Sequence, residues 1–263
     1  MIPISSSFGL IQWIEDTRSL DELICLTLSD KEIDCCQNIV KKYAKWIQKA
    51  APEKRLIRDF YIEAVSKYSQ QAVTENMNRL IRETKQTALR DAFNSISPSP
   101  ECFVTLRRNF IISYATMCVA HWLAGIGDRH LQNTLVRIAT GRCLGIDFGH
   151  AFDSGIGASV PELVPFRLTP QILELLRPFT ERDLLATIMT HTMQALRDDQ
   201  GPILACMDIF VYKPVQWLNI NDDEIMRNGD ENINAGIKEY TNCDVRMLCK
   251  FYKIVNLINK IDF

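Results

Sequence analysis

The pattern of apolar and polar positions predicts a chain that is mostly helical. Apolar side chains recur at helical spacing from residue 33 to residue 47, directly after a capping box formed by Ser29 and Glu32. The apolar positions are Ile33, Cys36, Val40, Tyr43 and Ile47. Ser19 and Glu22 form the same device earlier in the chain, so a second helix is expected to begin there.

A longer helix is predicted after the break at Ser97-Pro98-Ser99-Pro100. Ser99 can cap this helix, Pro100 fits its first position, and Gly125 and Gly127 end it. Its apolar stripe consists of Phe103, Leu106, Phe110, Tyr114 and Met117.

Short extended segments are predicted in two places. Residues 135–138 and 143–146 are β-like runs joined by a tight turn, which predicts a hairpin. Near the N-terminus, residues 2–4 and 8–14 are apolar enough to be extended, and the polar residues 15–18 are expected to interrupt them.

The remaining segments favour helices again. Residues 53–96 are expected to form further helices, residues 171–197 to be helical with an interruption at Pro178, and residues 245–261 to form a terminal helix. The expected fold class is therefore α+β, mostly α-helical, with one small β-hairpin.

Composition narrows the possible functions. The formal net charge of -2 provides no overall attraction to nucleic acid or anionic lipid. The nine cysteines include no C-x-x-C pair, so reduced thiols are expected rather than a structural zinc site. The N-terminus lacks the features of a secretory signal. The uncharged stretch 110–127 contains Ser113, Thr116 and His121, so a buried helix is expected there rather than a membrane span.

Three residues around the predicted hairpin match the needs of phosphoryl transfer from ATP. Asp128 lies in the loop after the long helix, Asn133 precedes the first strand, and Asp147 ends the second strand within Asp147-Phe148-Gly149. The Asp-to-Asn spacing equals that of the protein-kinase catalytic loop H-R-D-x-x-x-x-N. A hairpin brings Asn133 and Asp147 close together, where both can hold Mg²⁺ while Asp128 faces the nucleophile.

Each of these residues alone also fits a structural role in a turn or a helix cap, and only their conjunction is specific. His130 is either a hydrogen-bonded structural imidazole or a group that stabilises charge on the γ-phosphate. Arg129 is expected to pair with a carboxylate, His150 to pack, and His121 to be a core histidine.

Residues 125–130 and 146–150 resemble the phosphatidylinositol 3-kinase superfamily, whose catalytic loop is written D-R-H-x-x-N. The resemblance implies catalytic roles for Asp128 and His130. It also implies ATP and Mg²⁺ as cofactors. The residues implied to bind the metal ion and the nucleotide are Asn133 and Asp147.

The segment after Asp147-Phe148-Gly149 discriminates between the lipid and protein kinases of this superfamily. A lipid kinase needs Lys or Arg there to hold an anionic inositol head group, but residues 150–165 contain neither. The chain therefore resembles the protein-kinase branch, with a phosphatidylinositol 3- or 4-kinase as the alternative. The residues implied for the activation loop or the substrate are Gly149, Pro165, Phe166 and Arg167.

The resemblance also implies a domain division. Residues 1–220 are expected to form a protein-kinase-like C-lobe, and residues 221–263 a C-terminal tail. Within the C-lobe, residues 1–15 follow the hinge, residues 125–149 hold the catalytic and metal-binding loops, and residues 150–169 form the activation loop. The N-lobe is expected to be absent, so the chain is expected to be inactive alone.

The likeness is strongest to the DNA-repair members of the protein-kinase branch. It implies protein substrates in which Ser or Thr precedes Gln, a nuclear location and a role in joining DNA double-strand breaks. DNA-end-binding repair factors would be bound by other regions of a larger chain, and neither a membrane nor direct nucleic-acid binding is expected for this one. A non-catalytic, truncated interaction module remains the third possibility.

Overall fold

The computed structural model describes residues 2–5, 8–50, 63–64, 66–151 and 164–205, to which the fold and the site below are confined. The helices are α1 (Leu20–Cys25), α2 (Asp30–Gln48), α4 (Gln70–Ile81), α5 (Ala88–Ile96), α6 (Pro100–Ala124), α7 (Pro170–Leu176) and α8 (Thr187–Asp198). The strands are β1 (Ile2–Pro3), β2 (Gly9–Leu10), β3 (Thr17–Ser19), β4 (Thr134–Arg137) and β5 (Cys143–Gly145). A short 3-10 helix, η1 (Leu131–Asn133), precedes β4, and a π-helical turn, η3 (Arg182–Ala186), precedes α8. The α+β, mostly helical class is confirmed.

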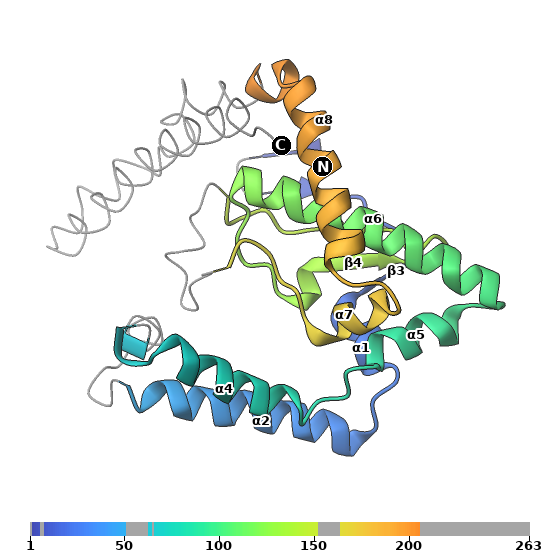
Figure 1. Ribbon diagram of the computed structural model, residues 1–263. Coiled ribbons are helices and arrows are strands. Elements are labelled where there is room, and N and C mark those ends of the chain that lie inside the picture. Colours follow the sequence, from blue (N-terminus) through green and yellow to red (C-terminus); the bar gives the residue numbers. More distant parts are fainter. Residues whose placement is uncertain (1, 6–7, 51–62, 65, 152–163, 206–263) are drawn as a thin grey trace, which may run out of the picture.

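Helix α6 runs through the middle of the molecule and packs against α8, α5 and α7 (Figure 1). At its start the Ser99 hydroxyl accepts a hydrogen bond from the Cys102 amide, and Pro100 occupies the first turn. At its end Gly125 adopts the left-handed conformation with φ 59°. Both predicted boundaries are therefore confirmed.

The core gathers on α6 at the base of the predicted catalytic loops. Phe110 and Tyr114 stack with ring centroids 5.5 Å apart, and Phe93 from α5 meets Phe110 edge-on at 5.3 Å. Other fully buried side chains, drawn from α1, α5, α7 and β4, are Leu20, Leu23, Leu89, Val136, Ile172, Leu175 and Leu176. These contacts fix the loop that follows α6 against the rest of the fold.

A three-stranded antiparallel sheet in the order β3-β4-β5 supports the same loops. The predicted hairpin is confirmed as β4 and β5, with Leu135 opposite Leu144. The expected interruption is confirmed at Glu15 and Asp16, which form a bend, but it is wrong for Thr17 and Arg18, because Thr17–Ser19 forms the third strand and pairs with β4.

Asp16 explains why these polar residues join the sheet. Its backbone is left-handed, with φ 55°, so the chain turns into β3. Its carbonyl oxygen accepts a hydrogen bond from the Ile138 amide, and its carboxylate accepts one from the Ala139 amide. A contact across more than a hundred residues therefore sets the start of the strand, and no local pattern indicates it.

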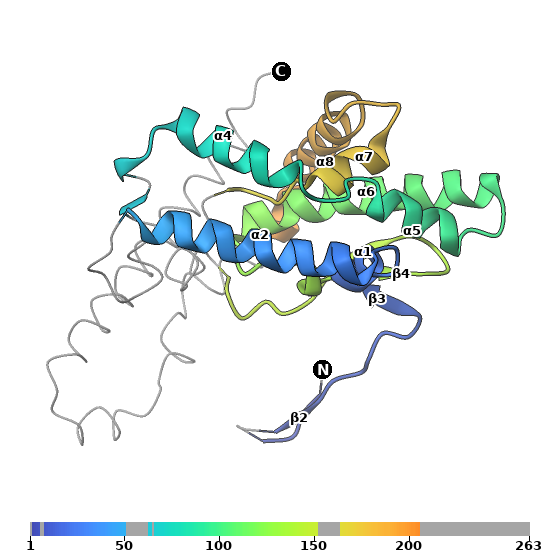
Figure 2. The ribbon, with the colours of Figure 1, turned by 90° about the horizontal axis from the view of Figure 1, so that it is seen from below.

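Helices α2 and α4 lie beside each other at one edge of the molecule (Figures 1 and 2). Both predicted capping boxes are present, at the starts of α1 and α2. The predicted stripe on α2 is only partly buried, since Ile47 is 3% exposed whereas Val40 is 69% exposed. Burial is confined to the C-terminal end of α2. There Ile47 packs with the stacked rings of Tyr43 and Trp46, also on α2, and of Tyr68.

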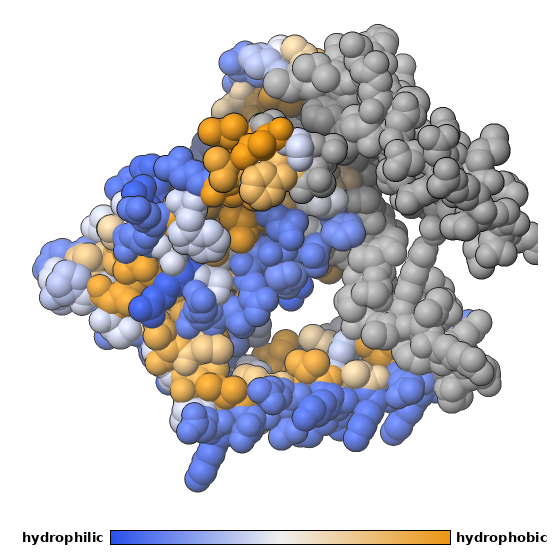
Figure 3. All heavy atoms as spheres, turned by 180° about the vertical axis from the view of Figure 1, so that it is seen from behind, coloured by the Kyte–Doolittle hydropathy of each residue, from blue (hydrophilic) through white to orange (hydrophobic). Residues whose placement is uncertain are grey.

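Strands β1 and β2 form a separate antiparallel hairpin that projects from the body (Figure 2). Its apolar side chains and those that follow it are exposed, and apolar surface gathers at this place in Figure 3. They include Ile2, Ile4, Phe8, Leu10, Ile11 and Trp13. Extended structure near residues 2–4 and 8–14 is thus confirmed, although the strands are shorter than these apolar runs.

Two further predictions are confirmed, and others cannot be compared. Helices α4 and α5 lie within residues 53–96, and residues 171–197 are helical on both sides of Pro178. The predicted helix at 245–261 lies outside the described residues, as do residues 152–163 of the activation loop. None of the described helices combines the length and the hydrophobicity needed to cross a bilayer. The six described cysteines are free thiols.

Candidate active site

The loop after α6 presents Asp128 and is fixed by Asn133. The Asn133 side-chain amide donates a hydrogen bond of 2.9 Å to the carbonyl oxygen of Asp128, and Asn133 is 6% exposed. The Asp128 side chain is 46% exposed. The buried Asn133 thus supports the loop from below, while the carboxylate of Asp128 remains open to a substrate.

The loop after β5 presents Asp147 next to the first loop. The Ile146 amide donates to the Asn133 carbonyl at 3.0 Å, and the Gly127 amide donates to the His150 carbonyl at 2.6 Å. The Asp147 carboxylate accepts a hydrogen bond of 3.2 Å from the Gly149 amide, which forms a local turn. The hairpin therefore brings the two loops into direct contact.

Backbone conformation sets Asp128 and Asp147 apart from most of the chain. Among the described residues, the non-glycine positions with positive φ are Asp16, Asp128 and Asp147, the last two with φ 56°. Aspartate tolerates this region better than most residues, yet the conformation still costs free energy. Such backbone outliers concentrate at functional sites, where surrounding contacts hold them in place. Asn133 supplies such a contact to Asp128, and Arg129 supplies one to Asp147.

Arg129 joins the two loops through backbone carbonyl oxygens. Its Nε donates to Gly127 at 2.7 Å, one terminal nitrogen donates to Ile146 at 2.9 Å, and the other donates to Asp147. The residue is 9% exposed. The planar fork of Arg129 thus joins the backbones of the two loops, and its expected pairing with a carboxylate stays a prediction. We call Arg129 with Gly127, Ile146 and Asp147 the Arg129 staple.

His130 lies beside Asp128 at the open side of the site. Its Nε2 is 3.9 Å from the Asp128 carboxylate, and both side chains are 46% exposed. A separation of this size between exposed groups is a weak attraction. His130 is therefore able to meet an anionic group that enters the site. His150, which was expected to pack, is exposed and contributes its backbone carbonyl to the loop contact.

His121 packs beneath the second loop. Its ring meets the ring of Phe148 edge-on, with centroids 5.7 Å apart and planes at 74°. Burial, together with the positive charge of Arg129, lowers the pKa of His121 from 6.5 to about 4, so the imidazole is neutral near pH 7. The expectation of a packed histidine is confirmed, although it lies beside the site rather than deep in the core.

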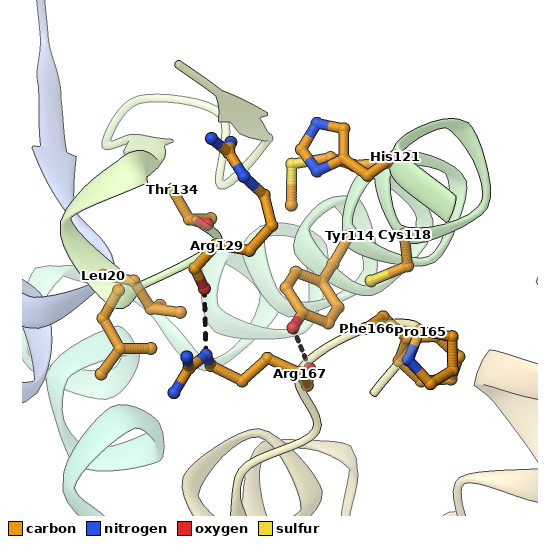
Figure 4. A pocket seen from close by; sticks show the side chains of 11 residues that line it. Leu20, Tyr114, Cys118, His121, Arg129, Thr134, Pro165, Phe166 and Arg167 are labelled. Carbon is orange, nitrogen blue, oxygen red and sulfur yellow. Dashed lines mark hydrogen bonds between the residues drawn. The ribbon is translucent and has the colours of Figure 1, made fainter. Parts of the chain in front are cut away.

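Residues 165–167, at the end of the predicted activation loop, pack against the loop that follows α6 (Figure 4). Arg167 Nε donates to the Arg129 carbonyl at 2.9 Å, and the Tyr114 hydroxyl donates to the Arg167 carbonyl. Burial raises the pKa of Tyr114, which keeps this hydroxyl protonated as a donor. Pro165 and Phe166 line the adjoining cavity of about 30 Å³, which is room for a water molecule rather than a substrate.

Pro165, Phe166 and Arg167, which the sequence assigns to the activation loop or the substrate, lie against Tyr114 and the carbonyl of Arg129. Their predicted role stays a prediction. Tyr114 is expected only as a core residue. Its apolar neighbours on the helical stripe give no signal of its second contact.

Asn133 and Asp147 have the donor atoms that a hard divalent cation requires. The Asn133 amide nitrogen is bound to Asp128, which leaves its Oδ1 as the acceptor, and Asp147 uses one oxygen for Gly149 and retains the other. The described residues include no group of three or more His, Cys, Asp or Glu side chains placed to hold a metal ion. Mg²⁺ needs few protein ligands when phosphate oxygens and water complete its shell, so the pair fits.

Comparison with known proteins decides the family. The sequence model described as "Phosphatidylinositol 3- and 4-kinase" matches residues 1–220. The chain belongs to this family. Membership agrees with the D-R-H-x-x-N and Asp-Phe-Gly motifs, which lie on the two loops that the Arg129 staple joins.

Relatives within the family are protein kinases by name. The chain is 36% identical over 260 residues to the DNA-dependent protein kinase catalytic subunit of Gallus gallus, covering 93% of this chain and 6% of that protein. It is 27% identical over 240 residues to serine/threonine-protein kinase TOR of Arabidopsis thaliana, covering 89% of this chain and 9% of that protein. The chain therefore spans less than a tenth of the length of these relatives, and the resemblance to the protein-kinase branch is confirmed.

A solved structure supports the fold. The FAT and kinase domain of CtTel1 superposes with a TM-score of 0.62 and 21% sequence identity, covering 98% of this chain and 17% of that one. The arrangement of helices and small sheet is thus shared with a structure whose title names a kinase domain.

Proposed function

We propose that this chain is the catalytic region of a protein kinase that transfers the terminal phosphoryl group of ATP to a Ser or Thr hydroxyl. The observation that carries the proposal is the junction of the two loops, in which Asn133 holds the Asp128 backbone and Arg129 holds the Asp147 backbone. The names of the relatives support the reaction class, and the name of TOR supports serine and threonine as acceptors.

Asp128 is proposed to orient the acceptor hydroxyl and to take up its proton. Its exposed carboxylate stands on a fixed backbone, which suits a group that must meet a mobile side chain. The acceptor oxygen then bonds to the γ-phosphorus while the bond to the bridging oxygen breaks, and ADP leaves. His130, exposed beside Asp128, is proposed to stabilise the negative charge on the transferred group.

Asn133 and Asp147 are proposed to hold Mg²⁺ and, through it, the phosphates of ATP. The ion, when bound, neutralises charge on the phosphates. The role of the chain is to fix the two oxygen ligands, since Asn133 is buried and the backbone of Asp147 is bound by Arg129. Arg129 therefore acts through backbone geometry, with its own charge turned toward carbonyl oxygens.

A protein substrate is proposed because of the charge of the activation loop. Residues 150–165 contain no Lys or Arg, whereas an inositol phosphate head group requires cations around it. The nearest described cation after this segment, Arg167, donates its Nε to the Arg129 carbonyl. A phosphatidylinositol kinase is the second candidate, supported by the description of the family as a whole.

Residues 1–220 are proposed to form the kinase C-lobe and residues 221–263 its tail. Support comes from the match of the family over residues 1–220 and from the helical fold. We also propose a DNA-dependent role in the nucleus, in the repair of double-strand breaks. The reason is that the chain is 36% identical in sequence to a protein named DNA-dependent protein kinase catalytic subunit. A preference for Ser or Thr followed by Gln, and DNA-end-binding partners, belong to this second proposal.

Phosphorylation by the natural full-length product tests the reaction. Peptides with Ser-Gln, peptides with Ser-Ala and phosphatidylinositol vesicles serve as acceptors, with and without linear double-stranded DNA. We expect Ser-Gln peptides to be preferred, DNA to stimulate, and Asp147→Ala or Asp128→Asn to lower the rate at least about a hundredfold. The control Asp34→Asn, on the exposed face of α2, should leave the rate unchanged.

Each result separates two proposals. Peptide phosphorylation that survives Asp147→Ala contradicts the assignment of the site, and vesicle phosphorylation above peptide phosphorylation favours the lipid kinase. If the phosphorylation rate is the same with and without DNA, and the same for Ser-Gln and Ser-Ala peptides, the DNA-dependent role is wrong. The assignment as a protein kinase then still stands. A full-length product that phosphorylates nothing favours the non-catalytic interaction module.

A further inference from the structure

Gly145 leaves a space that His121 fills. A Cβ atom built on Gly145 would lie 2.5 Å from Cε1 and 2.7 Å from Nε2 of the His121 ring, far inside normal contact. Met117 Sδ lies 3.5 Å from the same point and bounds the space on another side. The last turn of α6 therefore packs its histidine directly on the backbone of β5, two residues before Asp147.

Phe148 is held on the outside of the fold by contacts with two side chains. It is 54% exposed, so burial alone does not fix its position. His121 meets its ring edge-on, and the guanidinium carbon of Arg129 lies 5.6 Å from its centroid. Both arrangements are attractive for an aromatic ring, the first between ring edge and face, the second between cation and face.

We propose that His121 is a positioning residue for Asp147: its ring occupies the space left by Gly145, supports Phe148, and so fixes the turn that presents the Asp147 carboxylate. The functional consequence rests on the proposed role of Asp147 as a metal ligand. The neutral state of His121 suits this position, because a second cation beside Arg129 would repel it.

The direction of the Asp147 carboxylate is set by a hydrogen bond and a left-handed backbone. The bond joins its Oδ1 to the Gly149 amide across Phe148, so a displacement of Phe148 acts on both ends of that turn. His121 and Arg129 both contact the Phe148 ring. Loss of the imidazole should loosen the turn while the Arg129 staple continues to hold the Asp147 backbone.

The test compares His121→Ala, Gly145→Ala and the double variant in the 263-residue chain. One readout is the hydrogen-exchange rate of the Gly149 amide, measured by NMR without metal. The other is the dissociation constant for Mn²⁺ alone, measured by electron paramagnetic resonance. We expect each single variant to raise both quantities about three- to tenfold, the range of one aromatic contact. His191→Ala, an exposed histidine on α8, is the matched control and should change neither.

The double variant provides the sharpest comparison. Because the methyl group that Gly145→Ala adds then enters space that the imidazole has vacated, this second change should add nothing to the effect of His121→Ala. Additive effects of the two changes, or an unchanged Gly149 exchange rate in His121→Ala, overturn the inference. Should Gly145→Ala fail to fold, the exchange rates of His121→Ala and of the double variant still decide.

The proposed function is judged separately by Asp147→Ala. If this variant binds Mn²⁺ as the wild type does, Asp147 is not the metal ligand and the proposed site fails. The exchange rate of Gly149 in His121→Ala tests the action of His121 on the turn in either case. The two readouts together therefore show which of the two proposals is wrong.

Discussion

Replacement of Arg129 by lysine should destabilise the chain more than any conservative change of an exposed arginine. Arg129 is 9% exposed and donates to three carbonyl oxygens that lie in different directions, on Gly127, Ile146 and Asp147. A lysine ammonium can reach one of them but not all three, since it lacks the planar fork. With hydrogen bonds from charged groups worth about 1.5–3 kcal/mol each, the loss of two gives a decrease of about 3 kcal/mol or more in the free energy of unfolding.

Urea unfolding followed by far-ultraviolet circular dichroism measures this change. Arg142→Lys is the matched control, because Arg142 lies on the same hairpin with an exposed side chain and should shift the free energy of unfolding by no more than about 0.5 kcal/mol. If Arg129→Lys costs no more than Arg142→Lys, the staple does not hold the two loops together. A decrease confined to Arg129→Lys supports the staple as the contact that holds the two loops together.

Three further measurements test other contacts. Because the folded chain holds the pKa of His121 at about 4 against an ordinary 6.5, the unfolded state binds the extra proton between these values, and stability should fall as pH falls through that window. Allowing for solvent screening, the loss is about 1–2 kcal/mol by about pH 4.5, and a His121→Gln variant with the same pH dependence would refute it. Gly141→Ala should cost about 2 kcal/mol or more in urea unfolding, since φ is +72° and the new Cβ would lie 2.3 Å from a carbonyl oxygen of α6. Gly201→Ala, which meets no atom within 4 Å, is its control, and equal costs would contradict the steric argument. Ser19→Ala should lower the melting temperature through a loss of about 1 kcal/mol, because Ser19 and Glu22 cap α1 reciprocally; an unchanged melting temperature would mean that the cap adds nothing.

Features set by neighbours in sequence were predictable. The capping boxes at Ser19 and Ser29, the start of α6 at Ser99 and its end at Gly125 all depend on residues within one helical turn. The β4–β5 hairpin is local for the same reason. These elements place the predicted catalytic loop and the Asp-Phe-Gly turn, so the location of the candidate site also followed from the sequence.

Features set by distant partners were not predictable from pattern. Strand β3 depends on the hydrogen bond that Asp16 accepts from the turn before β5. The polar character of residues 15–18 gives no sign of this strand. The hydrogen bonds of Arg129 to three backbone carbonyl oxygens could not be predicted, because backbone carbonyls carry no sequence signal. The fit of His121 on Gly145 joins positions that no spacing rule connects. The apolar stripe on α2 predicted a buried Val40, but Val40 is exposed. The position of neighbouring elements decides which part of a helix face is covered.

The two aspartates lie on loops that are joined by hydrogen bonds. Each adopts a left-handed backbone, at a cost on the order of 1 kcal/mol that surrounding contacts must offset. The Asn133 amide stabilises Asp128, and the Arg129 guanidinium stabilises Asp147. Arg129 lies in the first loop and bonds to the second, and the amides of Gly127 and Ile146 add further bonds between the loops. The backbones of both aspartates are therefore held in position, which is what the proposed placement of their carboxylates requires.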